Sequence, residues 1–120
     1  MSGGNLTSSI SNAVLSANSP VLAVETIETP VPRVFSLMQN YPNPFNPATT
    51  IKFTIHEHGF TTLKVYNLLG KEVATLVKEN LHAGVLHQVT FQASRLSSGM
   101  YFYRLESGKQ MQVKKLLLLK

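Results

Sequence analysis

The stretch that decides the fold is residues 99–120, GMYFYRLESGKQMQVKKLLLLK. It contains two β-prone runs, residues 100–105 and 111–119, separated by a polar turn at residues 106–109. Gly108 in this turn can adopt the positive φ that a tight hairpin needs. The second run ends in four consecutive leucines, and burying each leucine side chain is worth roughly 1.5–3 kcal/mol. The stretch therefore predicts a closing β-hairpin whose leucines lie either in the sheet core or against another protein.

Similar β signals recur upstream, at the spacing typical of a sandwich. Ile51, Phe53 and Ile55 alternate with polar residues, as in a strand with one buried face. Between Val73 and Leu76 the apolar residues change from odd to even positions, which predicts a bulge or a local twist. With no convincing helix, these signals predict an all-β fold, an antiparallel immunoglobulin-like β-sandwich of about seven strands. The expected strands are residues 34–38, 51–55, 61–68, 72–77, 85–91, 100–105 and 111–119.

Residues 41–47, YPNPFNP, form a segment that we name the proline loop. Its prolines fix φ and remove backbone donors, which excludes a helix or a central strand. We expect its apolar rings, Tyr41 and Phe45, to cap one end of the core. Its asparagines each precede a proline and can bond nearby backbone through their amides. We predict an ordered scaffold loop made of Tyr41, Pro42, Asn43, Pro44, Phe45, Asn46 and Pro47.

Charge and composition divide the chain at residue 32. Residues 1–32 are rich in Ser, Asn, Thr and Pro, and they contain two Glu and no Lys or Arg, giving a charge of −2. Residues 33–120 hold all 11 basic residues and four Glu, giving +7. We interpret residues 1–32 as a linker from an upstream domain that is missing here, and residues 33–120 as one β-sandwich domain.

Composition also excludes several classes of function. The chain has no Cys and no Asp, so it can form no disulfide, thiolate metal site or Ser-His-Asp triad. We therefore expect no enzyme activity and no cofactor. No Arg-rich run appears, and no apolar run approaches the roughly 20 residues of a membrane span. We expect neither a nucleic-acid partner nor a transmembrane span.

Two groups of side chains could suggest a binding site. His56 and His58 are two residues apart, so they would share one face of a strand, and His82 or His87 could complete a zinc site. Their position at an expected hairpin tip favours solvated polar residues instead. Similarly, the residues at positions 101, 103 and 105 would share a strand face, which favours sandwich core over a ligand platform.

Four segments, in order along the chain, resemble one known family. They are LMQNYPNPFNPATTI at residues 37–51, LKVYNLLGKEV at 63–73, LSSGMY at 96–101 and KKLLLLK at 114–120. Over residues 35–120 the chain closely resembles the type A C-terminal sorting domain of the type IX secretion system.

The resemblance implies a non-catalytic signal that directs a larger secreted protein from the periplasm through the type IX outer-membrane translocon of Gram-negative bacteria. The expected destination is the medium or the cell surface. In many members a sortase then removes the domain and joins the new end to anionic lipopolysaccharide. By match to the family pattern, the recognised residues would be Gly99, Tyr101, Lys114, Lys115, Leu116, Leu117, Leu118, Leu119 and Lys120.

The residues alone leave a second function open, an accessory β-sandwich that binds polysaccharide or packs against its parent enzyme. For a sorting signal, a physical route exists through the closing hairpin. An exposed strand edge can be read by strand addition, in which backbone bonds give affinity and alternate side chains give selectivity. Lys114, Lys115 and Lys120 would steer such a hairpin toward an acidic receptor.

Overall fold

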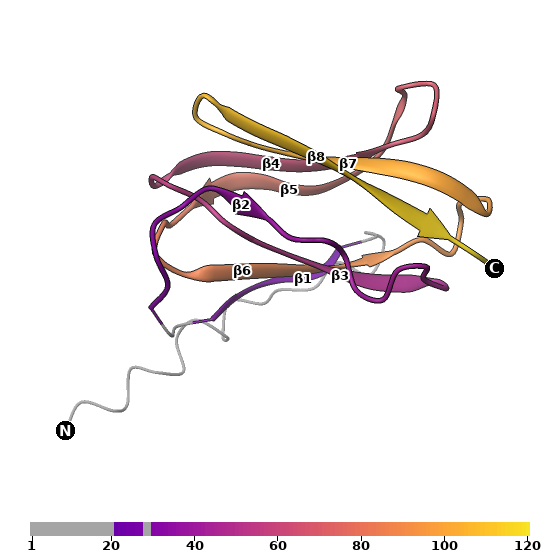
Figure 1. Cartoon of the computed structure of the whole chain (residues 1–120), viewed down its shortest axis with the longest axis horizontal. Coiled ribbons are helices and arrows are strands. Elements are labelled where there is room, and N and C mark those ends of the chain that lie inside the picture. The colour runs from indigo at the N-terminus through magenta and orange to yellow at the C-terminus, as the bar shows by residue number, and fades with distance from the viewer. Residues whose placement is uncertain (1–20, 28–29) are drawn as a thin grey trace.

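The computed structural model describes residues 30–120 and the backbone of residues 21–27, and it forms a two-layer β-sandwich (Figure 1). One sheet has the strand order β1-β6-β3-β2 and the other β5-β4-β7-β8, with antiparallel neighbours throughout. This confirms the predicted fold, since β2 to β8 correspond to the seven expected strands. The strands are β1 (Val21–Ile27), β2 (Ser36–Leu37), β3 (Ala48–Thr54), β4 (Gly59–Tyr66), β5 (Glu72–Leu81), β6 (Leu86–Gln92), β7 (Gly99–Ser107) and β8 (Gln110–Leu118).

Strand β1 lies within the segment that the sequence analysis assigns to the linker. It pairs with β6 from Ile27↔Leu86 to Val21↔Phe91, with one register shift on the way. The segment therefore contributes an edge strand to the sandwich, while residues 1–20 and 28–29 lie outside the described residues. The division of the chain at residue 32 stays a prediction.

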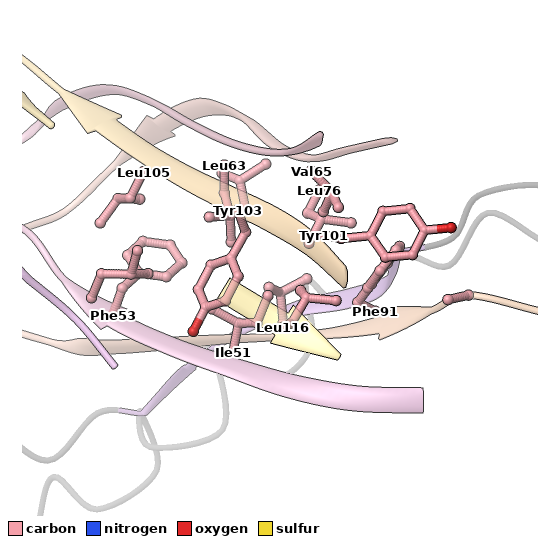
Figure 2. Close-up of a cluster of buried hydrophobic side chains, with 14 of the residues drawn as sticks. Ile51, Phe53, Leu63, Val65, Leu76, Phe91, Tyr101, Tyr103, Leu105 and Leu116 are labelled. Carbon is pink, nitrogen blue, oxygen red and sulfur yellow. The ribbon is translucent and has the colours of Figure 1, made fainter. Parts of the chain in front are cut away.

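The core fills the space between the two sheets with every second side chain of the facing strands (Figure 2). Ile51 and Phe53 of β3 face this space from one sheet, and Leu63 and Val65 of β4 face it from the other, all fully buried. Tyr103 of β7 is also fully buried. The alternation in the sequence therefore predicted the buried faces of β3 and β7, because burial on one face requires a period of two.

The predicted bulge lies in β5. Leu63 pairs with Val77, whereas its neighbour Lys64 pairs with Thr75, so Leu76 is the extra residue. As a result Leu76 and Val77, although adjacent, are both buried. A bulge allows this because it turns the side chain of the extra residue, Leu76, toward the face of the strand that Val77 already occupies.

The strand bounds differ from the prediction at most ends, and β4 runs from Gly59 to Tyr66 where residues 61–68 were expected. β5 continues past residue 77 to Leu81, because β4 begins at Gly59 and supplies partners for the additional residues. The turn of the closing hairpin narrows to two residues, since Ser107 pairs with Gln110. Gly108 adopts a φ of +60° there, as the first central position of a type II′ turn requires.

Candidate functional site

The closing hairpin places β8 at one edge of its sheet, where β7 is its only strand neighbour among the described elements. In Figure 1 the hairpin forms the yellow and orange strands, and β8 ends beside the loop that precedes β3. Leu116 and Leu118 point into the core and are fully buried, whereas Leu119 is half exposed. The leucine run thus serves the core with alternate residues and leaves others at the surface.

Two of the predicted signal residues, Gly99 and Tyr101, lie in β7, where Gly99 is half-buried and Tyr101 is buried. Gly99 begins β7 with a φ of +152°, a backbone conformation that L residues with a side chain rarely adopt. Tyr101 is 8% exposed, and its hydroxyl donates to the Ser97 carbonyl at 2.7 Å. Together they fix the path of the chain into β7.

The predicted signal residues that reach the surface lie on β8 and just beyond it. Lys115, Leu119 and Lys120 are exposed, while Lys114 and Leu117 are half-buried. The Lys120 ammonium donates to the carbonyl of Ser94 at 2.5 Å. The site that sequence motifs assign to one continuous run is therefore divided between core and surface.

The proline loop covers the outer edge of β8 near its end. The Phe45 N–H donates to the Leu117 carbonyl, and the Leu119 N–H donates to the Phe45 carbonyl, both at 3.0 Å. The Asn43 side-chain oxygen accepts the Leu117 N–H at 3.0 Å. Phe45 is 2% exposed and plugs the core beside Phe91, with 6.1 Å between ring centroids.

The expected second plug of this loop is wrong. Tyr41 is 81% exposed, although its backbone forms a bridge with Thr50. The two bonds of that bridge leave the side chain on the outside of the loop. Phe45 alone supplies the apolar contact that the sequence suggested for both rings.

Asn40 is a structural residue of the site that the sequence analysis missed. It is 2% exposed, and its N–H donates to the Tyr103 hydroxyl at 2.8 Å. Its side-chain amide donates to the Thr49 hydroxyl at 3.0 Å and to the Pro42 carbonyl at 3.1 Å. These bonds hold the start of the proline loop against β7. The sequence feature that indicates such a contact is Tyr103 at an expected core position, because a buried hydroxyl needs a hydrogen-bond partner.

Two glutamines connect the remainder of β8 to the other sheet. The Gln39 amide donates to the Lys115 carbonyl at 2.7 Å. The Gln112 side-chain oxygen accepts the Leu37 N–H at 3.3 Å. β8 is therefore held near its start by β2 and near its end by the proline loop, as well as by its ladder with β7.

The histidines of the β3–β4 hairpin make backbone contacts. The His58 Nδ1 accepts the Ala83 N–H at 2.8 Å, and the His56 Nδ1 lies 2.9 Å from the Arg33 carbonyl. Within the part of the chain that the structure describes, no group of three or more His, Cys, Asp or Glu is placed to hold a metal ion. The hairpin thus has a structural use for both rings.

The fold and the hairpin agree with the sequence comparison. A family model described as "Secretion system C-terminal sorting domain" matches residues 39–119, more than half of the chain. The chain belongs to this family. It is accordingly a C-terminal sorting signal for the type IX secretion system, and the accessory-module alternative is not favoured. A comparison with curated proteins finds no match.

Membership of this family indicates, in general terms, what the sorting domain interacts with and where the exported protein goes. Such a signal interacts with the type IX secretion machinery and implies secretion or surface localisation through the outer membrane. The family is one of sorting signals and not of enzymes. Among the described residues no helix is long and apolar enough to cross a membrane.

Proposed function

We propose that the sorting domain presents its signal on the outward side of β8, through Lys115, Leu119 and Lys120. The supporting observation is the division of the predicted signal residues by burial. Leu116 and Leu118 are fully buried, so a partner cannot touch them without unfolding the hairpin. These buried residues contribute indirectly, by holding the exposed side chains in position.

Charge supports the same assignment. Residues 99–120 contain five basic residues and one Glu, a net charge of 5 − 1 = +4. The single ion pair of this segment among the described residues joins Arg104 to Glu106 at 3.5 Å, which leaves the lysines of β8 without a carboxylate partner there. A cationic surface steers encounter with an acidic one and raises the association rate. The receptor is therefore expected to be acidic where it meets β8.

The test is export of a periplasmic reporter fused to residues 21–120 in a host that carries a type IX system. The double variant Lys115→Glu and Lys120→Glu should lower export about tenfold or more, because it replaces attraction by repulsion. The matched control is Lys52→Glu with Lys71→Glu, which makes the same charge change at exposed positions away from the closing hairpin. Equal export of the two double variants would contradict recognition of the outward side of β8.

Deleting residues 116–120 is a weaker test. The deletion removes two fully buried leucines and the bonds that hold the proline loop. Removing a buried leucine costs about 2–5 kcal/mol, so the fold would be lost together with the signal. Surface substitutions separate recognition from stability, provided that circular dichroism and thermal unfolding match the wild type.

We further propose that a sortase removes the domain after export and joins the secreted protein to anionic lipopolysaccharide. The support is the resemblance of the motifs to members that are processed in this way. Mass spectrometry of the exported reporter decides the point. Processing predicts loss of the domain's mass and a heterogeneous adduct at the new end, whereas an intact fusion on the surface or in the medium contradicts it.

A further inference from the structure

The edges of the two sheets differ in how well they are protected against another strand. An edge strand offers unpaired backbone groups unless it is short, bulged, charged or covered. β2 is two residues long, and β5 carries two register shifts together with exposed Lys78, Glu79 and Asn80. Neither is a good template for pairing. β8 is the edge strand opposite β5.

The edge of β8 is covered along only part of its length. Leu117 and Leu119 direct backbone groups outward to the proline loop, away from β7. Because outward and inward groups alternate along an antiparallel strand, Val113 and Lys115 direct theirs to the same edge. Gln39 bonds the Lys115 carbonyl and the Gln112 side chain accepts the Leu37 N–H of β2, but among the described residues no strand or loop forms a backbone pair with this edge between residues 111 and 115.

The side chains next to this open segment are apolar and exposed. Met111 is 56% exposed and Val113 is 46% exposed, on the face of the sheet opposite the core. Across the ladder they pair with Glu106 and Arg104 of β7. An open backbone edge flanked by exposed apolar side chains has the two features that strand addition uses, main-chain bonds and alternate side-chain contacts.

We propose that the β8 edge at residues 111–115 accepts an extended acidic segment of the sorting machinery by strand addition, and that the proline loop ends the added strand before residue 117. The inference rests on the proposed function and names how the same hairpin is read. The loop occupies the next outward positions with its own backbone bonds, so an added strand cannot extend further without displacing it.

Charge selects an acidic segment over a second copy of this chain. Pairing two β8 edges would bring two hairpins of charge +4 together, with no carboxylate on β8 to compensate. Like charges on adjoining strands are destabilising, whereas an acidic strand gains from Lys115 at the edge. The added strand is expected to carry carboxylates on one face and apolar residues on the other.

The test uses a fluorescein-labelled eight-residue peptide of alternating Glu and Val as the probe, with binding to residues 21–120 followed by anisotropy. Val113→Pro removes the outward N–H without touching a bond to β7, and it should weaken binding about tenfold or more. Val113→Thr keeps the backbone and should bind within about threefold of wild type. Binding should also weaken with salt.

A second variant keeps the proposal testable if Val113→Pro fails to unfold cooperatively. Lys115→Glu changes a side chain at the same edge and should weaken the peptide about tenfold, while Lys52→Glu on β3 should leave binding within about twofold. Absence of peptide binding to the wild type, or equal binding by Lys115→Glu, would overturn the inference. So would sedimentation showing a dimer that Val113→Pro dissolves.

Export assays of the fusion variants distinguish a failure of this inference from a failure of the proposed function. If the wild-type fusion and a folded Val113→Pro fusion are exported equally, the edge is not the site that is read, although the domain is still a sorting signal on β8. If the fusion with Lys115→Glu and Lys120→Glu is exported normally while the peptide binds the wild-type domain at β8, the proposed role of these lysines in export fails. Strand addition at the β8 edge then still stands.

Discussion

Tyr103 connects the core of the sandwich to the loop that covers β8. Its ring is fully buried, and its hydroxyl accepts the Asn40 N–H at 2.8 Å and donates to the Met38 carbonyl at 2.7 Å (Figure 2). Burial raises the pKa of Tyr103 to about 12, so the hydroxyl keeps its proton and its role as donor to a more alkaline pH than an ordinary tyrosine. At the residue scale, one oxygen therefore satisfies two backbone groups.

Replacing Tyr103 by Phe should destabilise the domain by about 1–3 kcal/mol, because a buried N–H and a carbonyl lose their partner while the ring stays. Urea unfolding measures the change. Tyr101→Phe is the matched control, since it deletes one bond to Ser97 near the surface and should cost about 0.5–1.5 kcal/mol. Equal losses in the two variants would contradict the role given to the Tyr103 hydroxyl.

His87 predicts a dependence of stability on acid. It is 1% exposed and stacks on Phe53 with 5.3 Å between ring centroids, and burial lowers its pKa below 6.5. The unfolded state therefore takes up a proton first as pH falls. The contribution of His87 to stability is complete above pH 6.5 and is lost as pH falls through the lower folded pKa, by at most about 1.4 kcal/mol per pH unit.

Urea unfolding of the wild type and of His87→Gln at pH 7.5 and pH 5 checks this expectation. Glutamine keeps an N–H that can donate to the His82 carbonyl, as the His87 Nε2 does at 2.7 Å, but it does not titrate. The stability difference between the two proteins should shrink on acidification. A difference that is independent of pH would show that another group is responsible.

At the scale of elements, the sequence predicted the strands and their buried faces but not how β8 is covered. Alternation of apolar residues is a local signal, and it identified β3 and β7 with the correct faces. The hydrogen bond between Asn43 and Leu117 joins residues 74 positions apart, and no periodicity encodes such a pairing. The open edge had a faint local signal, because apolar residues change from odd positions at Met111 and Val113 to even positions at Leu116 and Leu118.

The proline loop gives a prediction at this scale. Asn43→Ala removes the acceptor of the Leu117 N–H while Phe45 remains in the core. Losing one such bond is worth about 0.5–1.5 kcal/mol, so hydrogen exchange at Leu117 should accelerate about twofold to tenfold. The Lys114 amide, on the side of β8 that faces β7, serves as the internal control. Equal acceleration at both amides would indicate general destabilisation instead of local opening.

At the scale of the whole molecule, the closing hairpin and the upstream segment 21–27 lie in different sheets. β8 and the proline loop lie at one edge of one sheet, whereas β1 closes the β6 edge of the other. Composition placed residues 21–27 in a linker because the surrounding segment is rich in Ser, Asn, Thr and Pro, whereas in the structure they join the sandwich by backbone pairing to β6. Whether the segment belongs to the folded domain is a question of energetics that composition cannot answer.

Comparing residues 33–120 with residues 21–120 answers it. Each backbone bond lost with β1 is worth about 0.5–1.5 kcal/mol net, but ordering each residue costs about 1–2 kcal/mol, so unfolding free energies should differ by less than about 2 kcal/mol. The larger effect should be self-association of the shorter chain, because the β6 edge is open. Light scattering and urea unfolding measure the two quantities. Export should be equal for both fusions, since the closing hairpin is in the other sheet; a folded, monomeric 33–120 fusion that is not exported would place part of the signal before residue 33.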